Sequence, residues 1–211
     1  MFLTLANQVT LLRILLIFPF VICLLKMRVP DYGDWIRGGA VLIFLIMAVS
    51  DALDGYWARK KKQVTALGAF LDPMADKLMI TCACIVLCVP QTAVEGFVLP
   101  LTVVVMIIGK DILLLLGFII TFLMTGQVHI KPVCAGKVST FLQITMVFSI
   151  LIGPEMSRWI ICWHFIASAI SWSTGFCAMM ATLVYIYRGI RYIDEFGSTE
   201  KIICGPLDNK K

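Results

Sequence analysis

The chain has 211 residues, of which 60% are hydrophobic and 15% are charged, and its mean hydropathy is +0.95. This composition excludes an ordinary soluble domain and predicts a membrane protein, in which about six spans of roughly 20 residues occupy the length and leave no room for a second domain. The net charge of +5 comes from basic residues scattered between apolar runs, which argues against nucleic acid as a partner and favours contact with anionic lipid headgroups.

The first apolar run, residues 5–27, is predicted to be a membrane-spanning helix. No basic leader precedes it and no small-residue cleavage site follows it, so a signal peptide is not expected. Asn7, Thr10 and Arg13 are spaced three residues apart near its start and form one polar face. A helix cap and a snorkelling arginine would explain that face in structural terms. Residues 28–37 are then predicted to form a loop.

The second span begins near Gly38 and carries a charged segment at its far end. Asp51, Gly55 and Arg59 are spaced four residues apart and therefore share one helical face. The lysines at positions 60–62 mark the membrane boundary, and retention of positive charge on the cytoplasmic side is sufficient to explain them.

The third span, residues 69–89, begins with a second acidic stripe. Gly68, Asp72 and Asp76 repeat the four-residue spacing, so this helix carries two carboxylates one turn apart. The glycine lacks a Cβ atom and lets a bulky ligand approach the helix backbone closely. Both stripes lie near the same membrane face, where they can oppose each other across a cavity.

Four carboxylates facing one cavity, from Asp51, Asp54, Asp72 and Asp76, would repel one another unless cations lay between them. The cluster contains neither His nor Cys, and oxygen ligands alone favour Mg²⁺ or Mn²⁺. The sequence therefore predicts a divalent metal site. A divalent-cation channel or carrier is the alternative of another class, although a pore would not require the Gly and Arg spacing.

Three further spans are predicted from the remaining apolar runs. The fourth, residues 97–124, contains Lys110 and Asp111, which must face protein or water and either form an ion pair or line a pocket. A loop over residues 125–136 leads to the fifth span, which opens with a polar face. The sixth, residues 159–187, has aromatic residues suited to membrane interfaces. The polar face of the fifth span consists of Lys137, Thr140 and Gln143.

The predicted fold class is all-α. Residues 1–190 are expected to form a polytopic six-transmembrane-helix bundle with a polar cavity at the cytoplasmic side, and residues 191–211 a polar C-terminal tail. Basic residues outside the spans concentrate on the side that holds the lysines at 60–62 and the end of the chain, so both termini are expected in the cytoplasm.

The segment from Asp51 to Asp76 resembles the signature of the CDP-alcohol phosphatidyltransferases, D-x2-D-G-x2-A-R-x8-G-x3-D-x3-D, and contains every fixed residue of it. The six-helix hydropathy pattern of that family covers nearly the whole chain. The resemblance implies an enzyme that transfers a phosphatidyl-type group from CDP-diacylglycerol to an alcohol and releases CMP. It also implies a homodimer in the inner membrane of a bacterium.

The resemblance further implies roles for individual residues. Two Mg²⁺ or Mn²⁺ ions would be held by the four aspartates, and Asp76 would also serve as the general base. Contacts with the cytidine nucleotide are expected from Gly55, Arg59, Thr65 and Gly68, and from Asn7 and Thr10 of the first span. Contacts with an acceptor phosphate are expected from Lys110, Lys131, Lys137 and Arg13.

Within the family, the sequence leaves two anionic acceptors open. The stretch G-A-F-L-D-P-M-A-D-K and the N-x2-T-x2-R pattern of the first span most resemble bacterial members that use glycerol 3-phosphate. Their usual A-R-E stretch is replaced here by Gly109, Lys110 and Asp111, and no matching Leu-Arg pair follows. The pattern from Gly109 through G-K-V-S-T-F-L-Q also resembles the CMP-forming cardiolipin synthases, whose acceptor is phosphatidylglycerol.

Overall fold

The computed structural model describes the backbone of residues 5–29, 32–61, 66–125 and 134–203. It describes the side chains of residues 10–29, 32–50, 74–117, 119 and 136–189. The described chain is all-α, as predicted. Its helices are α1 (Leu5–Lys26), α2 (Gly33–Lys61), α3 (Ala66–Cys88), α4 (Leu101–Thr125), α5 (Cys134–Leu151), α6 (Gly153–Trp159) and α7 (Trp163–Ile203).

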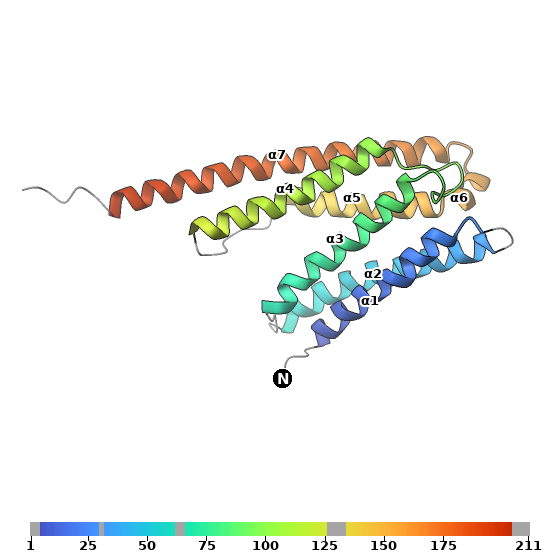
Figure 1. Cartoon of the computed structure of the whole chain (residues 1–211), viewed down its shortest axis with the longest axis horizontal. Coiled ribbons are helices and arrows are strands. Elements are labelled where there is room, and N and C mark those ends of the chain that lie inside the picture. The colour runs from blue at the N-terminus through green and yellow to red at the C-terminus, as the bar shows by residue number, and fades with distance from the viewer. Residues whose placement is uncertain (1–4, 30–31, 62–65, 126–133, 204–211) are drawn as a thin grey trace, which may run out of the picture.

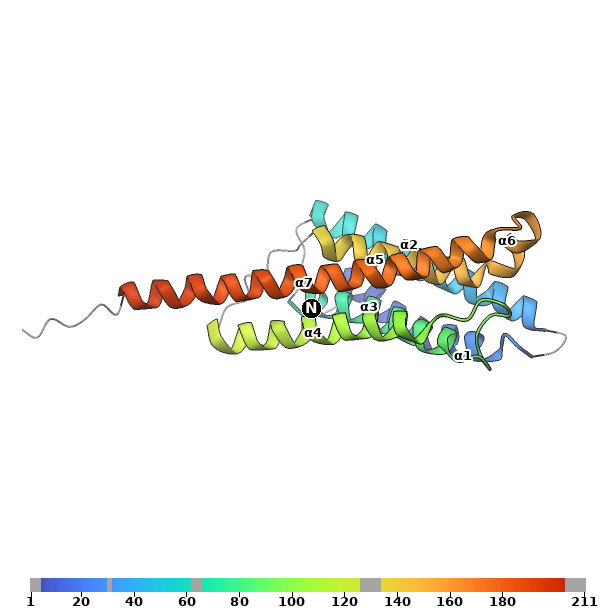
Figure 2. The same ribbon diagram turned by 90° about the horizontal axis from the view of Figure 1, so that it is seen from above.

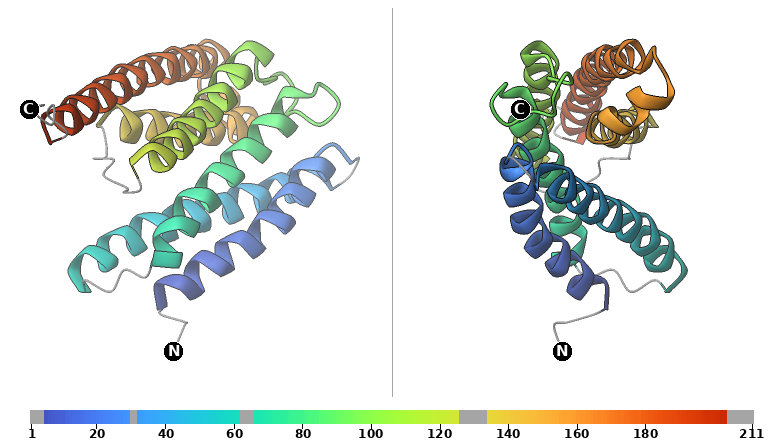
Figure 3. Two further views of the ribbon diagram at one scale, coloured as in Figure 1. Left: turned by 60° about the vertical axis from the view of Figure 1, so that its left-hand side comes forward. Right: turned by 90° about the vertical axis from the view of Figure 1, so that its right-hand side faces the viewer.

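The long helices run back and forth between two ends of the bundle (Figure 1). One end holds the start of α1, the end of α2 and the start of α3, together with the end of α4, the start of α5 and the last part of α7; we call it the motif end. The opposite end holds α6 and the connection from α3 to α4. Figure 3 shows α3 between the α1–α2 pair and the group formed by α4, α5 and α7, so α3 contacts both halves.

The core of the bundle is apolar, and so is much of its outer surface. Inside, the rings of Phe20 on α1 and Phe44 on α2 pack with their centroids 5.8 Å apart. Outside, large side chains such as Leu15, Phe18 and Ile22 are exposed. Helices that are apolar on both faces are typical of membrane-embedded bundles, where lipid replaces water around the protein.

Among the described residues, the segments 33–50 and 163–189 are long and apolar enough to cross a membrane. A third span is present if α5 and α6, which meet at an angle of 71°, are taken as one broken span. Pro154 lies at the start of α6, where its missing N–H costs no helical hydrogen bond.

The start of α4 differs from the prediction. The apolar run begins at Phe97, but the helix begins at Leu101, after Pro100. The intervening residues are not helical; the Leu99 N–H donates to the Leu87 carbonyl at 3.0 Å, and the Phe97 ring stacks on His164 with centroids 4.1 Å apart. Hydropathy could not separate this segment from the helix because both are apolar.

The last helix also extends further than expected. Helix α7 continues through residue 190, the predicted boundary of the tail, to Ile203. Figures 1 and 2 show this last part of α7 extending beyond the ends of the other helices. The division of the chain at residue 190 stays a prediction, and it falls inside a continuous helix.

Candidate active site

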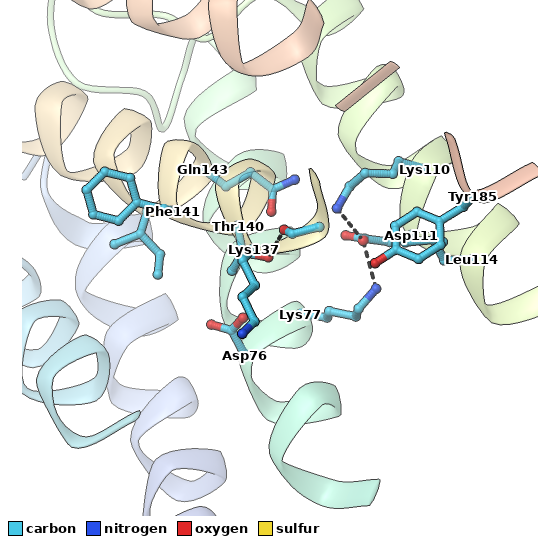
Figure 4. Close-up of a pocket in the computed structure, with 12 residues that line it drawn as sticks. Asp76, Lys77, Lys110, Asp111, Leu114, Lys137, Thr140, Phe141, Gln143 and Tyr185 are labelled. Carbon is cyan, nitrogen blue, oxygen red and sulfur yellow. Dashed lines mark hydrogen bonds and ion pairs between the residues drawn. The ribbon is translucent and has the colours of Figure 1, made fainter. Parts of the chain in front are cut away.

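A cavity of about 450 Å³ lies between α3, α4, α5 and α7 (Figure 4). Its lining combines carboxylates, ammonium groups and apolar side chains from these four helices. The lining residues are Asp76 and Lys77 of α3, Lys110, Asp111 and Leu114 of α4, Gly136, Lys137, Thr140, Phe141, Gln143 and Ile144 of α5, and Tyr185 of α7.

One carboxylate oxygen in the cavity wall joins two lysines from different helices. The Asp111 Oδ1 atom lies 2.9 Å from the Nζ atom of Lys110 and 2.8 Å from the Nζ atom of Lys77. The Lys110 side chain is only 4% exposed and Asp111 is 13% exposed, whereas Lys77 is 38% exposed. Charged groups this deeply buried require partners, and the ion triad supplies them while tying α3 to α4.

The carboxylate of Asp76 faces the same cavity from the neighbouring position on α3. The exposed side chain of Lys137, on α5, extends toward it (Figure 4). Lys137 and Thr140 are three residues apart and share one face of α5, as the sequence predicts. The Thr140 hydroxyl donates to the Gly136 carbonyl at 3.2 Å, so it is already engaged within its own helix.

Gln143 lies one turn further along α5 and is only 2% exposed. Its Nε2 atom has no hydrogen-bond partner among the described residues. A buried amide donor without a partner carries a desolvation cost of about 1–3 kcal/mol, so its presence in a cavity wall points to a polar ligand or water that binds there.

Tyr185 of α7 lines the cavity where it packs closely against Gly136 at the start of α5. A Cβ atom at position 136 would overlap the Tyr185 hydroxyl, so any other residue there would require the Tyr185 side chain to shift. The sequence pattern suggested interfacial anchors for the aromatic residues of the sixth span, but Tyr185 is half-buried in the bundle instead. Its place in the wall depends on which faces of α5 and α7 meet.

The structure brings together three of the predicted site residues, Asp76, Lys110 and Lys137. Lys110 forms the predicted ion pair and also lines a cavity, and its assignment to the acceptor pocket stays a prediction. Sequence reasoning gave no site role to Lys77 or Tyr185. The sequence feature that could have pointed to Lys77 is its position directly after Asp76.

The remaining predicted residues lie elsewhere or outside the described part. Thr10 and Arg13 are buried in α1 at 1% exposure and are not among the residues that line the cavity. The interpretation of Arg13 as a snorkelling residue is wrong, because its side chain is enclosed by the bundle. Thr65 and Lys131 lie outside the described residues, and the Asn7 side chain is not among those described.

The other motif residues are placed by their backbone. The last turns of α2 carry Asp51, Asp54, Gly55 and Arg59, and the first turns of α3 carry Gly68 and Asp72, as the spacing predicts. Of the motif aspartates, only Asp76 has a described side chain. Within the described side chains, no group of three or more His, Cys, Asp or Glu residues forms a metal site, so the four-aspartate site stays a prediction.

Comparison with known proteins gives consistent relatives. A CDP-diacylglycerol--glycerol-3-phosphate 3-phosphatidyltransferase of Bacillus subtilis is 35% identical over 156 residues, which cover 70% of this chain and 76% of the relative. A protein of the same name from Rickettsia felis is 30% identical over 188 residues, which cover 89% of this chain and 96% of the relative. A CMP-forming cardiolipin synthase of Oryza sativa is 42% identical over 84 residues, 38% of this chain and 26% of the relative.

A sequence profile gives the family directly. The profile of the CDP-alcohol phosphatidyltransferases matches residues 3–180, which include the whole aspartate motif and the start of every long helix. The chain therefore belongs to the CDP-alcohol phosphatidyltransferase family of phospholipid-synthesising membrane enzymes.

Proposed function

We propose that this enzyme transfers a phosphatidyl group from CDP-diacylglycerol to glycerol 3-phosphate, giving phosphatidylglycerophosphate and CMP. The bacterial relatives named for this reaction align with most of the chain. The cavity supports an anionic acceptor, because Asp76, Lys110 and Lys137 line the same cavity. A carboxylate able to accept a proton lies there beside ammonium groups able to bind a phosphate.

In the proposed reaction, the acceptor phosphate binds Lys110 and Lys137, and its free hydroxyl group is directed toward Asp76. The Asp76 carboxylate accepts the hydroxyl proton while the oxygen attacks the phosphatidyl phosphorus. The bond from that phosphorus to the CMP oxygen breaks, and CMP leaves. Holding the acceptor at both ends fixes the attacking oxygen near the phosphorus, which lowers the entropic part of the barrier.

The donor set suits two Mg²⁺ or Mn²⁺ ions, because Asp51, Asp54, Asp72 and Asp76 offer only carboxylate oxygens and their helices end and begin within a few residues of each other. When bound, such ions neutralise the diphosphate and the charge that develops on CMP. Chelation with EDTA is expected to abolish CMP release, and excess Mg²⁺ or Mn²⁺ to restore it. Activity that survives exhaustive chelation would contradict the metal site.

The nucleotide is assigned to the motif and to the first helix. Gly55 and Gly68 allow close approach to the backbone, and Arg59 is suited to a phosphate. Thr65, Asn7 and Thr10 complete the proposed nucleotide contacts, and Lys131 is proposed to assist the acceptor phosphate. The same role for Arg13, which is buried in α1 and does not line the cavity, stays a prediction.

Six spans, with both termini in the cytoplasm, fit the lengths of the long helices. Helices α1, α3 and α4 have 22, 23 and 25 residues, and at about 1.5 Å per residue each can cross a hydrocarbon layer of about 30 Å. The motif end then faces the cytoplasm, where the excess of basic residues belongs. We place the enzyme in the inner membrane of a bacterium as a homodimer.

A CMP-forming cardiolipin synthase, with phosphatidylglycerol as acceptor, is the second candidate. The similarity to the Oryza sativa enzyme favours it over a shorter part of the chain. Family membership gives no support to the channel alternative.

An acceptor panel tests the proposal. The purified protein is supplied with CDP-diacylglycerol and Mg²⁺ and with glycerol 3-phosphate, phosphatidylglycerol, inositol phosphate or serine, and the lipid products are identified by mass. We expect CMP release and phosphatidylglycerophosphate with glycerol 3-phosphate. Cardiolipin formation with phosphatidylglycerol alone would establish the second candidate instead.

A further inference from the structure

We propose that Lys77 and Asp111 set the net charge of the cavity and thereby determine which charge on the acceptor alcohol the enzyme prefers. The inference rests on the proposed function, since it concerns the alcohol that receives the phosphatidyl group. Neither residue needs to touch the reacting atoms, so both are positioning and specificity-determining residues rather than catalytic ones.

The geometry of the ion triad gives the first reason. Burial of Lys110 requires one anionic partner, and Asp111 at 2.9 Å is sufficient for that purpose. The same Asp111 oxygen also binds Lys77 at 2.8 Å. A second cation on one carboxylate leaves the triad with one net positive charge. The more exposed member, Lys77, borders the space where a ligand would bind.

The charge of the whole lining gives the second reason. The described lining contains three lysines, at 77, 110 and 137, and two aspartates, at 76 and 111, so it carries one net positive charge. A phosphate monoester has a charge of about −1.5 to −2 at pH 7, and a phosphate diester has only one negative charge. In a partly buried cavity, where solvent screens charge weakly, a change of one unit in the lining alters the affinity for these two acceptors unequally.

The test compares two acceptors that share the same attacking glycerol unit. Glycerol 3-phosphate is the monoester, and its methyl ester, glycerophosphomethanol, is the diester. The measured quantity is the ratio of kcat/KM for the monoester to kcat/KM for the diester. Asp111→Asn removes one negative charge with little change of shape, and we expect the ratio to rise about tenfold through a lower KM for the monoester. Lys77→Met removes one positive charge, and we expect the ratio to fall about tenfold.

Two further variants make the result specific to charge in the cavity. The double variant Lys77→Met/Asp111→Asn restores the net charge of the lining, so its ratio is expected to return to the wild-type value. Arg158→Met removes an exposed positive charge on α6, at the end opposite the motif, and should leave the ratio unchanged.

A purely structural role for the triad would give a different pattern, because loss of packing lowers activity toward both acceptors alike. The inference is overturned if the two single variants shift the ratio in the same direction or leave it unchanged. Should Asp111→Asn fail to fold, a Lys77→Met ratio that does not fall overturns it alone. The proposed function fails separately, if the wild-type protein forms no phosphatidylglycerophosphate from CDP-diacylglycerol and glycerol 3-phosphate.

Discussion

At the scale of single residues, Asp76 holds the position on which the proposed chemistry depends. It is a carboxylate in a cavity whose other charged groups are mostly lysines, and in the proposed reaction it accepts the proton of the acceptor hydroxyl. Asp76→Asn keeps the shape but cannot act as a base. We expect turnover to fall about 10²–10⁴-fold, measured as CMP release at saturating substrates.

The matched control for Asp76→Asn is Glu95→Gln, which makes the same chemical change at an exposed position in the connection between α3 and α4. Its turnover should equal that of the wild-type protein. Normal turnover by Asp76→Asn would remove the aspartate from the role of base.

Gln143 makes a second prediction at this scale. Its Nε2 atom is buried without a partner among the described residues, so the amide costs stability in the absence of a ligand. Gln143→Met has similar volume and no polar group. We expect the ligand-free variant to be more stable by about 1–3 kcal/mol in thermal unfolding, and its KM for the acceptor to rise.

Ser139 provides the comparison for Gln143, because its hydroxyl is also buried with no partner in the described part of the chain but does not line the cavity. Ser139→Ala should raise stability while leaving the acceptor KM unchanged. If Gln143→Met changes stability but not KM, the amide has no role in acceptor binding.

The sequence singled out some of the residues that line the cavity and missed others. Asp76 and Lys110 stood out because a charge within an apolar helix needs an explanation, and the cavity contains both. Tyr185 gave no such signal, since an aromatic side chain is ordinary in a membrane helix. Its role depends on the contact with Gly136, far away in the chain, which no local pattern reveals.

At the scale of helices, glycines fix how closely neighbouring elements pack. Gly136→Ala would place a methyl group against the Tyr185 hydroxyl and force the Tyr185 side chain to move. We expect this substitution to lower thermal stability by about 1–3 kcal/mol and to raise the KM for the acceptor, because the cavity wall moves.

Two alanine substitutions separate packing from function in this prediction. Gly189→Ala on α7 meets open space and should alter neither quantity. Gly153→Ala would overlap the Phe97 ring at the opposite end of the bundle, so it should lower stability without changing the acceptor KM. An unchanged KM in the Gly136 variant would show that Tyr185 does not shape the acceptor site.

Hydropathy predicted the number and order of the long helices, because each long apolar run must form a helix within lipid. It could not predict their ends. The run starting at Phe97 includes a non-helical segment, and the break at Ile152 that separates α5 from α6 falls within an apolar region. Local backbone geometry, set by Pro100 and Pro154, decided both boundaries.

At the scale of the whole molecule, the arrangement of the helices fixes which face of the membrane each group meets. Cys162 is an exposed thiol between α6 and α7, at the end opposite the motif. With the motif end in the cytoplasm, this thiol lies outside. We expect a membrane-impermeant maleimide to label it in spheroplasts made from intact cells.

Cys162→Ala provides the control and should abolish that labelling, since the other described cysteines lie within helices. Labelling of Cys162 only after the membrane is opened would show that the motif end faces outward. That result would contradict both the proposed orientation and the use of nucleotide-linked lipid from the cytoplasmic side.

The ion triad also has a consequence for biogenesis. A lysine or aspartate near the middle of a helix costs about 2.5–3.5 kcal/mol on release into lipid, so α4, with Lys110 and Asp111, is a poor candidate for insertion by itself. Lys77 on the preceding helix meets Asp111 across a connection of only a dozen or so residues. We therefore expect α3 and α4 to leave the translocon together as a hairpin, with the salt bridge formed before the rest of the chain is synthesised.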